Sequence, residues 1–253
     1  MDAIVAVLAD QQAELTGLLE GLDADGWHAP TRCEGWDVAD VVLHLAQTNE
    51  MAVASADGTF DDYLTRAAAL LAGPVSGVDE QAAAMVAAER GAPTAALFDR
   101  WSDGAATLVA LLDGMDLHTR VPWVAGLLSA RTLATTRLSE TWIHTGDVAG
   151  ALGVTLEPTD RLWQIARLAL RTLPYAFGSA GLELSGPVAF HLVGPAGEAW
   201  DFDPDEAAVT TITGAATELC DVAARRIDPA ATALVGEGPD ADAVLALVRT
   251  YAQ

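Results

Sequence analysis

The segment LSETWIHTGDV, residues 138–148, carries a glutamate, a histidine and an aspartate at intervals of four and three residues. In an α-helix, positions i, i+4 and i+7 share one face, so Glu140, His144 and Asp147 are predicted to point the same way. The apolar residues around them are spread over all sides of the helix, which predicts that this helix is buried. Because burying an unpartnered carboxylate is costly, the three side chains need a compensating charge, which a metal ion, an arginine or one another can supply.

Glu140 and His144 lie one helical turn apart, a spacing at which two side chains can hold a single metal ion. A third ligand from a facing helix would complete a His₂Glu set, and His44 is the residue predicted to supply it. Three protein ligands leave one position open, which distinguishes a catalytic zinc site from a closed structural site. Glutamate and histidine at this spacing are also common as solvated or salt-bridged neighbours, so the spacing alone leaves both interpretations open.

These side chains must be positioned by helices, and four long helical segments are predicted before residue 153. Their ranges are Ile4–Leu22, Val38–Ser55, Asp79–Arg90 extending or restarting at Thr94–Leu112, and Ala130–Leu152. Asp37 is the expected N-cap of the second helix, and His44 lies at the border of its inward face. Loops are predicted where glycine and proline cluster, around Gly73–Gly77 and Gly91–Pro93.

The pattern changes after residue 153. Thr159 or Asp160 can cap a further helix that extends to about Phe177. The alternating segments VAFHLVG and EAWDFDP flank PAG and predict a β-hairpin, and AVTTITG predicts a third strand. Helices at Ala215–Ile227 and Ala241–Tyr251 would cover one face of this sheet. The sequence therefore predicts a mainly α protein, with a four-helix bundle over residues 1–153 and a small α+β domain over residues 154–253.

Composition narrows the classes of function. The chain of 253 residues has 36 acidic and 13 basic residues, and every basic residue is arginine. This balance excludes a broad basic patch for nucleic acid and disfavours an anionic membrane surface, so a small-molecule substrate is expected. No apolar run approaches the length of about 18 residues needed to span a membrane, and the N-terminus lacks the basic region of a signal peptide. We therefore expect a cytoplasmic protein, whose oligomeric state the sequence leaves open.

Its two cysteines, Cys33 and Cys220, fit neither a disulfide framework nor a CxxC motif. They are interpreted as structural thiols, and Cys33, in the loop TRCEGW, is the one that can be reactive.

Three stretches carry a resemblance to a known family: TRCEGWDVADVVLHLA, RVPW and SARTLATTRLSETWIHTGDVAGALGV. Together they resemble the mycothiol-dependent maleylpyruvate isomerase family, a branch of the DinB-like metal-binding four-helix bundles that also carries a small C-terminal α/β domain. The resemblance implies a divalent metal, with zinc expected, bound by His44, Glu140 and His144. It also implies mycothiol as the thiol cosubstrate, activated at the metal, and a substrate-binding arginine from the C-terminal domain. Arg225 and Arg226 are the two residues that could match this arginine, although both also fit solvated positions at a helix C-terminus.

Other residues receive roles that the sequence leaves open. Asp147 can accept a proton from a ligand histidine, bind the metal, contact the substrate, or form an ordinary hydrogen bond between helices. Arg131 and Arg137 lie on the same helix and can serve as anion contacts or as partners of buried acids. Trp36 and Trp123 stand in loops next to the helices that carry the ligands, and they are predicted to line the cosubstrate pocket.

Three classes of function follow. A metal-activated thiol that adds to an electrophilic small molecule would make the protein an isomerase or an S-transferase. Without a thiol, the open position would support a hydrolase, lyase or isomerase of specialised metabolism. Without catalysis, the protein would bind a metal or sense a ligand.

Overall fold

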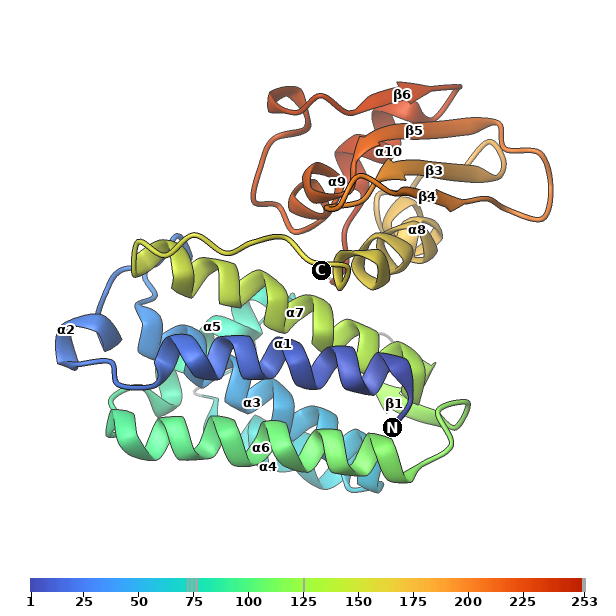
Figure 1. Ribbon diagram of the computed structural model, residues 1–253. Coiled ribbons are helices and arrows are strands. Elements are labelled where there is room, and N and C mark those ends of the chain that lie inside the picture. Colours follow the sequence, from blue (N-terminus) through green and yellow to red (C-terminus); the bar gives the residue numbers. More distant parts are fainter. Residues whose placement is uncertain (72, 74, 76, 125, 252–253) are drawn as a thin grey trace. The chain divides into compact units, whose positions relative to one another are not determined.

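The computed structural model describes all residues of the chain except 72, 74, 76, 125, 252 and 253 (Figure 1). The chain forms two compact units, Met1–Leu156 and Glu157–Tyr251. The first is a four-helix bundle with a small hairpin, and the second is a mixed sheet with helices. The predicted fold class, mainly α with a four-helix bundle followed by a small α+β domain, is confirmed.

Four long helices build the first unit. They are α1 (Ala3–Leu19), α3 (Val38–Asp57), α6 (Thr94–Gly114) and α7 (Ala130–Ala151). Helix α3 packs against α6 and α7, and α1 packs against the same two helices, so the four enclose one apolar core. The remaining elements of this unit are α2 (Ala24–Trp27), α4 (Phe60–Leu70), α5 (Val78–Glu89) and the antiparallel pair β1 (Arg120–Trp123) and β2 (Gly126–Ser129). Helices α2 and α4 and the hairpin were not predicted.

Helix α3, which carries His44, begins at the predicted residue. The Asp37 carboxylate accepts a hydrogen bond from the backbone N–H of Asp40 at 2.9 Å, and the Asp40 side chain accepts one from the N–H of Asp37 at 3.3 Å. This reciprocal pair satisfies two N–H groups that a helix start otherwise leaves unpaired. Arg90 then donates two hydrogen bonds of 2.8 Å to the Asp40 carboxylate, which joins the start of α3 to the residue after α5.

Helix α7, which carries Glu140, His144 and Asp147, is buried as predicted. Ser129 caps its start by accepting a hydrogen bond from the N–H of Thr132. Buried residues occur on every side of this helix, including three threonines and one serine as well as leucines. The Gln11 side chain of α1 donates to the Thr145 hydroxyl at 3.1 Å, so polar contacts help to fix α7 in the bundle.

The second unit contains a four-stranded sheet in the order β4-β3-β5-β6. The strands are β3 (Val188–Val193), β4 (Ala199–Phe202), β5 (Thr210–Ala215) and β6 (Val235–Glu237), and the helices are α8 (Leu162–Ser179), α9 (Ala216–Ala223) and α10 (Ala241–Leu247). A short 3₁₀ helix, η1, spans Pro229–Ala231. The predicted hairpin is the antiparallel pair β3–β4, whereas β3 and β5 pair in parallel. Helix α9 ends earlier than predicted because Arg225 adopts a left-handed conformation with φ of 58°.

Within the residues that the structure describes, no helix is both long and apolar enough to cross a membrane. The loop expected at Gly73–Gly77 falls partly outside those residues.

Candidate metal centre

Helices α3 and α7 bring His44, Glu140 and His144 together inside the bundle. His44 Nε2 lies 2.9 Å from Glu140 Oε1, and the two imidazole rings meet edge to face with centroids 5.1 Å apart. One ligand atom from each of the three side chains lies within 4.8 Å of the other two. The side chains are only 12%, 20% and 12% exposed, so an ion held there would be largely shielded from bulk water.

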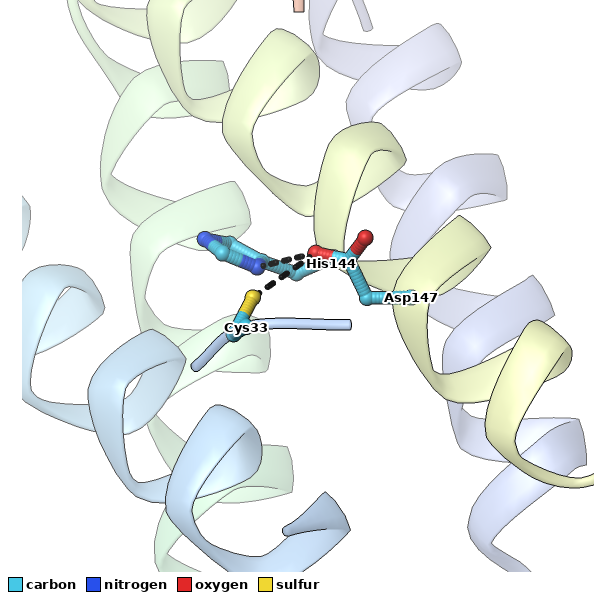
Figure 2. A group of neighbouring side chains, drawn as sticks. All are labelled: Cys33, His144 and Asp147. Atoms are coloured by element: carbon cyan, nitrogen blue, oxygen red, sulfur yellow. Dashed lines mark hydrogen bonds and ion pairs between the residues drawn. The ribbon is translucent and has the colours of Figure 1, made fainter. Parts of the chain in front are cut away.

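One ring nitrogen of His144, Nδ1, is hydrogen-bonded to Asp147. His144 Nδ1 lies 2.9 Å from Asp147 Oδ2, and the same oxygen accepts a hydrogen bond from the Cys33 thiol at 3.3 Å (Figure 2). Figure 2 shows Cys33 reaching from its loop toward the two side chains of α7. Because the buried carboxylate occupies Nδ1, the Nε2 atom of His144 is left for another partner.

The charges of the site favour the protonation states that bind a cation. Burial raises the pKa of the Glu140 carboxyl, but Arg137, followed by His44 and His144, outweighs burial and holds this pKa well below its usual range. Burial lowers the pKa of His144 and outweighs the opposing effect of its hydrogen bond to Asp147. At neutral pH these shifts favour an ionised carboxylate and a neutral imidazole, which are the forms that coordinate metals.

A second group of possible ligands shares His144. Cys33, His144 and Asp147 also have ligand atoms within 4.8 Å of one another. An imidazole that binds a cation through Nε2 keeps its proton on Nδ1. In His144 this proton would be donated to Asp147, which lies 2.9 Å from Nδ1. The two groups are therefore alternatives on one imidazole, and the contact with Asp147 favours the set that contains His44 and Glu140.

The two tryptophans predicted to line the cosubstrate pocket lie in different places. Trp36 lies beside the site, with its ring centroid 5.2 Å from that of His44. Trp123 lies on β1 and packs near Phe60, at a centroid distance of 6.4 Å. Its neighbour Pro122 accepts a hydrogen bond from Ser55, which is about three turns beyond His44, or about 16 Å along α3. The structure therefore brings Trp36 to His44 and the candidate ligand group, and it does not bring Trp123 there.

The four arginines singled out from the sequence make different contacts. Arg131 pairs with Asp2 at the surface, whereas Arg137 is fully buried and pairs with Glu140. Arg225 is exposed and donates to the carbonyl oxygen of Ala246 at 2.8 Å within the second unit. Arg226 is half-buried and donates to the carbonyl oxygen of Ala224 at 3.1 Å. The substrate-binding role of Arg225 or Arg226 stays a prediction.

The structure adds two residues to those singled out as site residues from the sequence. Cys33 contacts Asp147 across 114 residues of sequence, and Asn49 of α3 accepts hydrogen bonds from Arg137. No local pattern connects either residue to α7. The available signals were weak, namely a cysteine in the loop before α3 and a polar residue more than one turn beyond His44 on the same helix.

The chain is similar to known proteins in sequence and in fold. Residues 8–149 match the family model of the mycothiol maleylpyruvate isomerase N-terminal domain. Uncharacterized proteins of two strains of Mycobacterium tuberculosis, ATCC 25618 / H37Rv and CDC 1551 / Oshkosh, are each 34% identical over 251 residues, which is 98% of this chain and 95% of theirs.

Crystal structures of the mycothiol-dependent maleylpyruvate isomerase, and of a mutant in which one histidine is replaced by alanine, share the fold. Both have a TM-score of 0.59 over 94% of each chain, with 16% and 17% sequence identity respectively. The likeness at this level of identity concerns the fold, whereas the family model spans more than half of the sequence. The chain therefore belongs to the family defined by the mycothiol maleylpyruvate isomerase N-terminal domain.

Proposed function

We propose that this protein is an enzyme that uses a divalent metal, with zinc expected, and a thiol cosubstrate, mycothiol, to act on an electrophilic small molecule. The observation that carries the proposal is the convergence of His44, Glu140 and His144 from two helices, in a chain of the mycothiol maleylpyruvate isomerase family. The reaction would be either isomerisation or S-transfer, since both need the same activated thiol.

The residues present fit such an ion. Two imidazoles and one carboxylate are a known ligand set of catalytic zinc, and three protein ligands leave a position for an exchangeable fourth. The Glu140 carboxylate has a depressed pKa and is ready to bind a cation without losing a proton at neutral pH. A bound divalent ion would lower the pKa of a coordinated thiol, so that thiolate is present at neutral pH.

The neighbouring residues have separate tasks in this proposal. Asp147 accepts a hydrogen bond from His144 Nδ1 and so fixes the orientation of the ring and the nitrogen that remains free. Trp36 places an apolar ring beside His44 and would help to keep water from it. Arg225 or Arg226 would bind a substrate carboxylate, for which a guanidinium group is well shaped.

In the isomerase version, the thiolate adds to an activated carbon–carbon double bond and converts it to a rotatable single bond. After rotation, expulsion of the same thiolate regenerates the alkene as the other geometric isomer, and the cosubstrate is recovered. In the S-transferase version the thiol stays on the product. The cytoplasm, where low-molecular-weight thiols are kept reduced, is the compartment that either reaction requires.

Metal analysis of the purified protein tests the first part of the proposal. We expect about one equivalent of a divalent metal, and its loss in His44→Ala, Glu140→Ala and His144→Ala variants that keep their helical circular dichroism, since the bundle has its own apolar core. His191→Ala is the matched control, because His191 also pairs with a carboxylate, Asp203 Oδ1, at 2.8 Å but lies in the second unit. Full metal occupancy in the His144→Ala protein would exclude this ligand set.

Thiol dependence is tested by turnover of activated alkenes with and without mycothiol. Isomerisation without net loss of thiol identifies an isomerase, and stoichiometric consumption of thiol identifies an S-transferase. Turnover that persists without any thiol would overturn the proposal in favour of a hydrolase or lyase, and a bound metal without turnover would indicate a binding protein.

A further inference from the structure

Arg137 is a fully buried arginine in contact with one of the three ligand residues. It lies one turn before Glu140 on α7 and is 0% exposed. Its Nη1 donates to Glu140 Oε2, while its Nε and Nη2 donate to Asn49 Oδ1 of α3 at 3.3 and 3.0 Å. The guanidinium group is therefore held by side chains from the same two helices that supply the ligands.

Stability does not account for this arginine. Removing two charges from water is costly, and buried ion pairs can often be replaced by apolar side chains of similar volume without loss of stability. The arrangement also leaves Asn49 Nδ2 buried without a hydrogen-bond partner among the residues described, which adds a further cost. The position of Arg137 is thus better explained by its effect on Glu140 and on the charge of the site.

The first effect is geometric. Arg137 occupies Glu140 Oε2, whereas Oε1 faces His44 Nε2 at 2.9 Å. The two carboxylate oxygens are therefore assigned to different partners, and one of them remains directed at the site. Because Asn49 fixes the guanidinium from the opposite helix, the orientation of the Glu140 carboxylate depends on α3 as well as on α7.

The second effect is electrostatic. Arg137 contributes one positive charge, and Glu140 and Asp147 each contribute one negative charge, so these contacting groups carry a net charge of minus one with neutral imidazoles. A divalent cation changes the sum to plus one, and a single anionic ligand then makes it neutral. Without Arg137 the charges of Glu140, Asp147 and the divalent cation would already sum to zero, so an anionic ligand would make the sum negative. Uncompensated charge is unfavourable at a buried position, so the arginine should favour an anion in the open position.

Another charged cluster is less able to influence this balance. Arg100 pairs with Glu50 and Glu89, and these three side chains are 28–39% exposed. Solvent and salt therefore screen them more strongly than they screen Arg137.

We infer that Arg137 is a positioning residue that directs Glu140 Oε1 at the metal and selects an anionic ligand, such as a thiolate, over a neutral one. The inference rests on the proposed metal-dependent function, and it adds the feature that determines which class of ligand the open position accepts. Arg137 touches neither the reacting thiol nor the substrate in this scheme, because it acts through Glu140 and through its charge.

The test uses the Co²⁺-loaded protein, whose visible absorption reports ligands at the metal without any turnover. Azide is the anionic probe and imidazole is the neutral probe. In Arg137→Gln we expect azide affinity to fall about ten- to a hundredfold, with imidazole affinity changed less than about threefold. Arg137→Lys, which keeps the charge, should restore most of the preference for azide. Arg131→Gln is the matched control, because it removes a charge from the same helix at a surface position.

Asn49→Asp keeps Arg137 and places a second negative charge against it, so it should also weaken azide binding selectively. This variant and Arg137→Lys decide the question if Arg137→Gln does not fold. Equal losses for azide and imidazole, or no loss for either in Asn49→Asp, would overturn the inference and leave Arg137 a structural residue. Wild-type protein that takes up no Co²⁺ would instead refute the proposed function, so the two failures can be told apart.

Discussion

Replacing Asp147 by asparagine removes the negative charge behind His144 while keeping the shape of the side chain. Asp147 is 2% exposed, and its Oδ2 accepts hydrogen bonds from His144 Nδ1 at 2.9 Å and from Cys33 at 3.3 Å. In Asp147→Asn the single amide oxygen has to serve both donors, or the buried amide N–H₂ is turned toward them without an acceptor. The orientation of His144 is then no longer enforced.

The size of this effect follows from the contact that is lost. A hydrogen bond to a charged group contributes about 1.5–3 kcal/mol, and more of this is realised when the group is buried. If most of this free energy is lost from the metal-bound state, the affinity for the metal falls by about ten- to a hundredfold. This is the usual range for residues that support a metal-binding histidine. Cys33→Ala removes only a weak thiol donor, so its effect should be less than about threefold.

Competition with a chromophoric chelator for Zn²⁺ measures these changes directly. Asp203→Asn is the matched control, because Asp203 forms a similar 2.8 Å contact with His191, but the two side chains are 63% and 43% exposed. It should leave the metal affinity unchanged. Asp147→Asn protein that competes for Zn²⁺ as well as the wild type would show that Asp147 makes only an ordinary packing contact, and the argument from His144 Nδ1 would fail.

Three further predictions concern other parts of the chain. Arg225→Met and Arg226→Met are made separately, and we expect one of them to reduce turnover of a carboxylate substrate strongly while metal content stays unchanged. Normal kinetics in both variants and in the double variant would show that neither arginine binds the substrate. Burial, and then the charge of Glu50, raise the pKa of Tyr63 to about 12, so the unfolded chain ionises this tyrosine first as the pH rises. The free energy of unfolding should therefore fall between about pH 10 and 12 by up to about 2 kcal/mol from this group, and Tyr63→Phe should reduce the fall in denaturant titrations at these pH values. Asp37→Ala removes the cap of α3 and should lower the free energy of unfolding by about 1 kcal/mol, measured by urea titration; an unchanged midpoint would contradict the role of the cap.

The helices that carry the proposed ligands could be predicted from the sequence because their signals are local. The spacing of Glu140, His144 and Asp147 follows from the helical period, and Asp37 marks a helix start by its own chemistry. His44 was a weaker case, since periodicity placed it only at the border of the inward face. Its partnership with α7 was a hypothesis from the chemistry of a His₂Glu set, and the resemblance of its motif to a family strengthened it, because no local rule pairs helices that are distant in sequence.

Other features depend on contacts that leave no local trace. Pro122 argues against a strand in the segment that forms β1, so the hairpin and the position of Trp123 were not predicted. The parallel pairing of β3 with β5 cannot be predicted from the alternation of apolar and polar residues, because this alternation is the same in parallel and antiparallel strands. Arg225 ended a helix in a conformation that usually favours glycine, so its sequence contained no stop signal.

The contact between α1 and α7 has a consequence for how the protein is made. Gln11 and Thr145, which bond the two helices, are separated by 134 residues of chain. At bacterial or eukaryotic translation rates, ribosomes need on the order of ten seconds to synthesise that length. By the end of this interval α1, α3 and α6 have been synthesised without the helix that covers their remaining apolar face, and His44 without Glu140 and His144. Completion of the bundle is therefore a late, long-range event in synthesis, and substitutions that weaken α7 should expose the earlier helices to aggregation before they affect the finished protein.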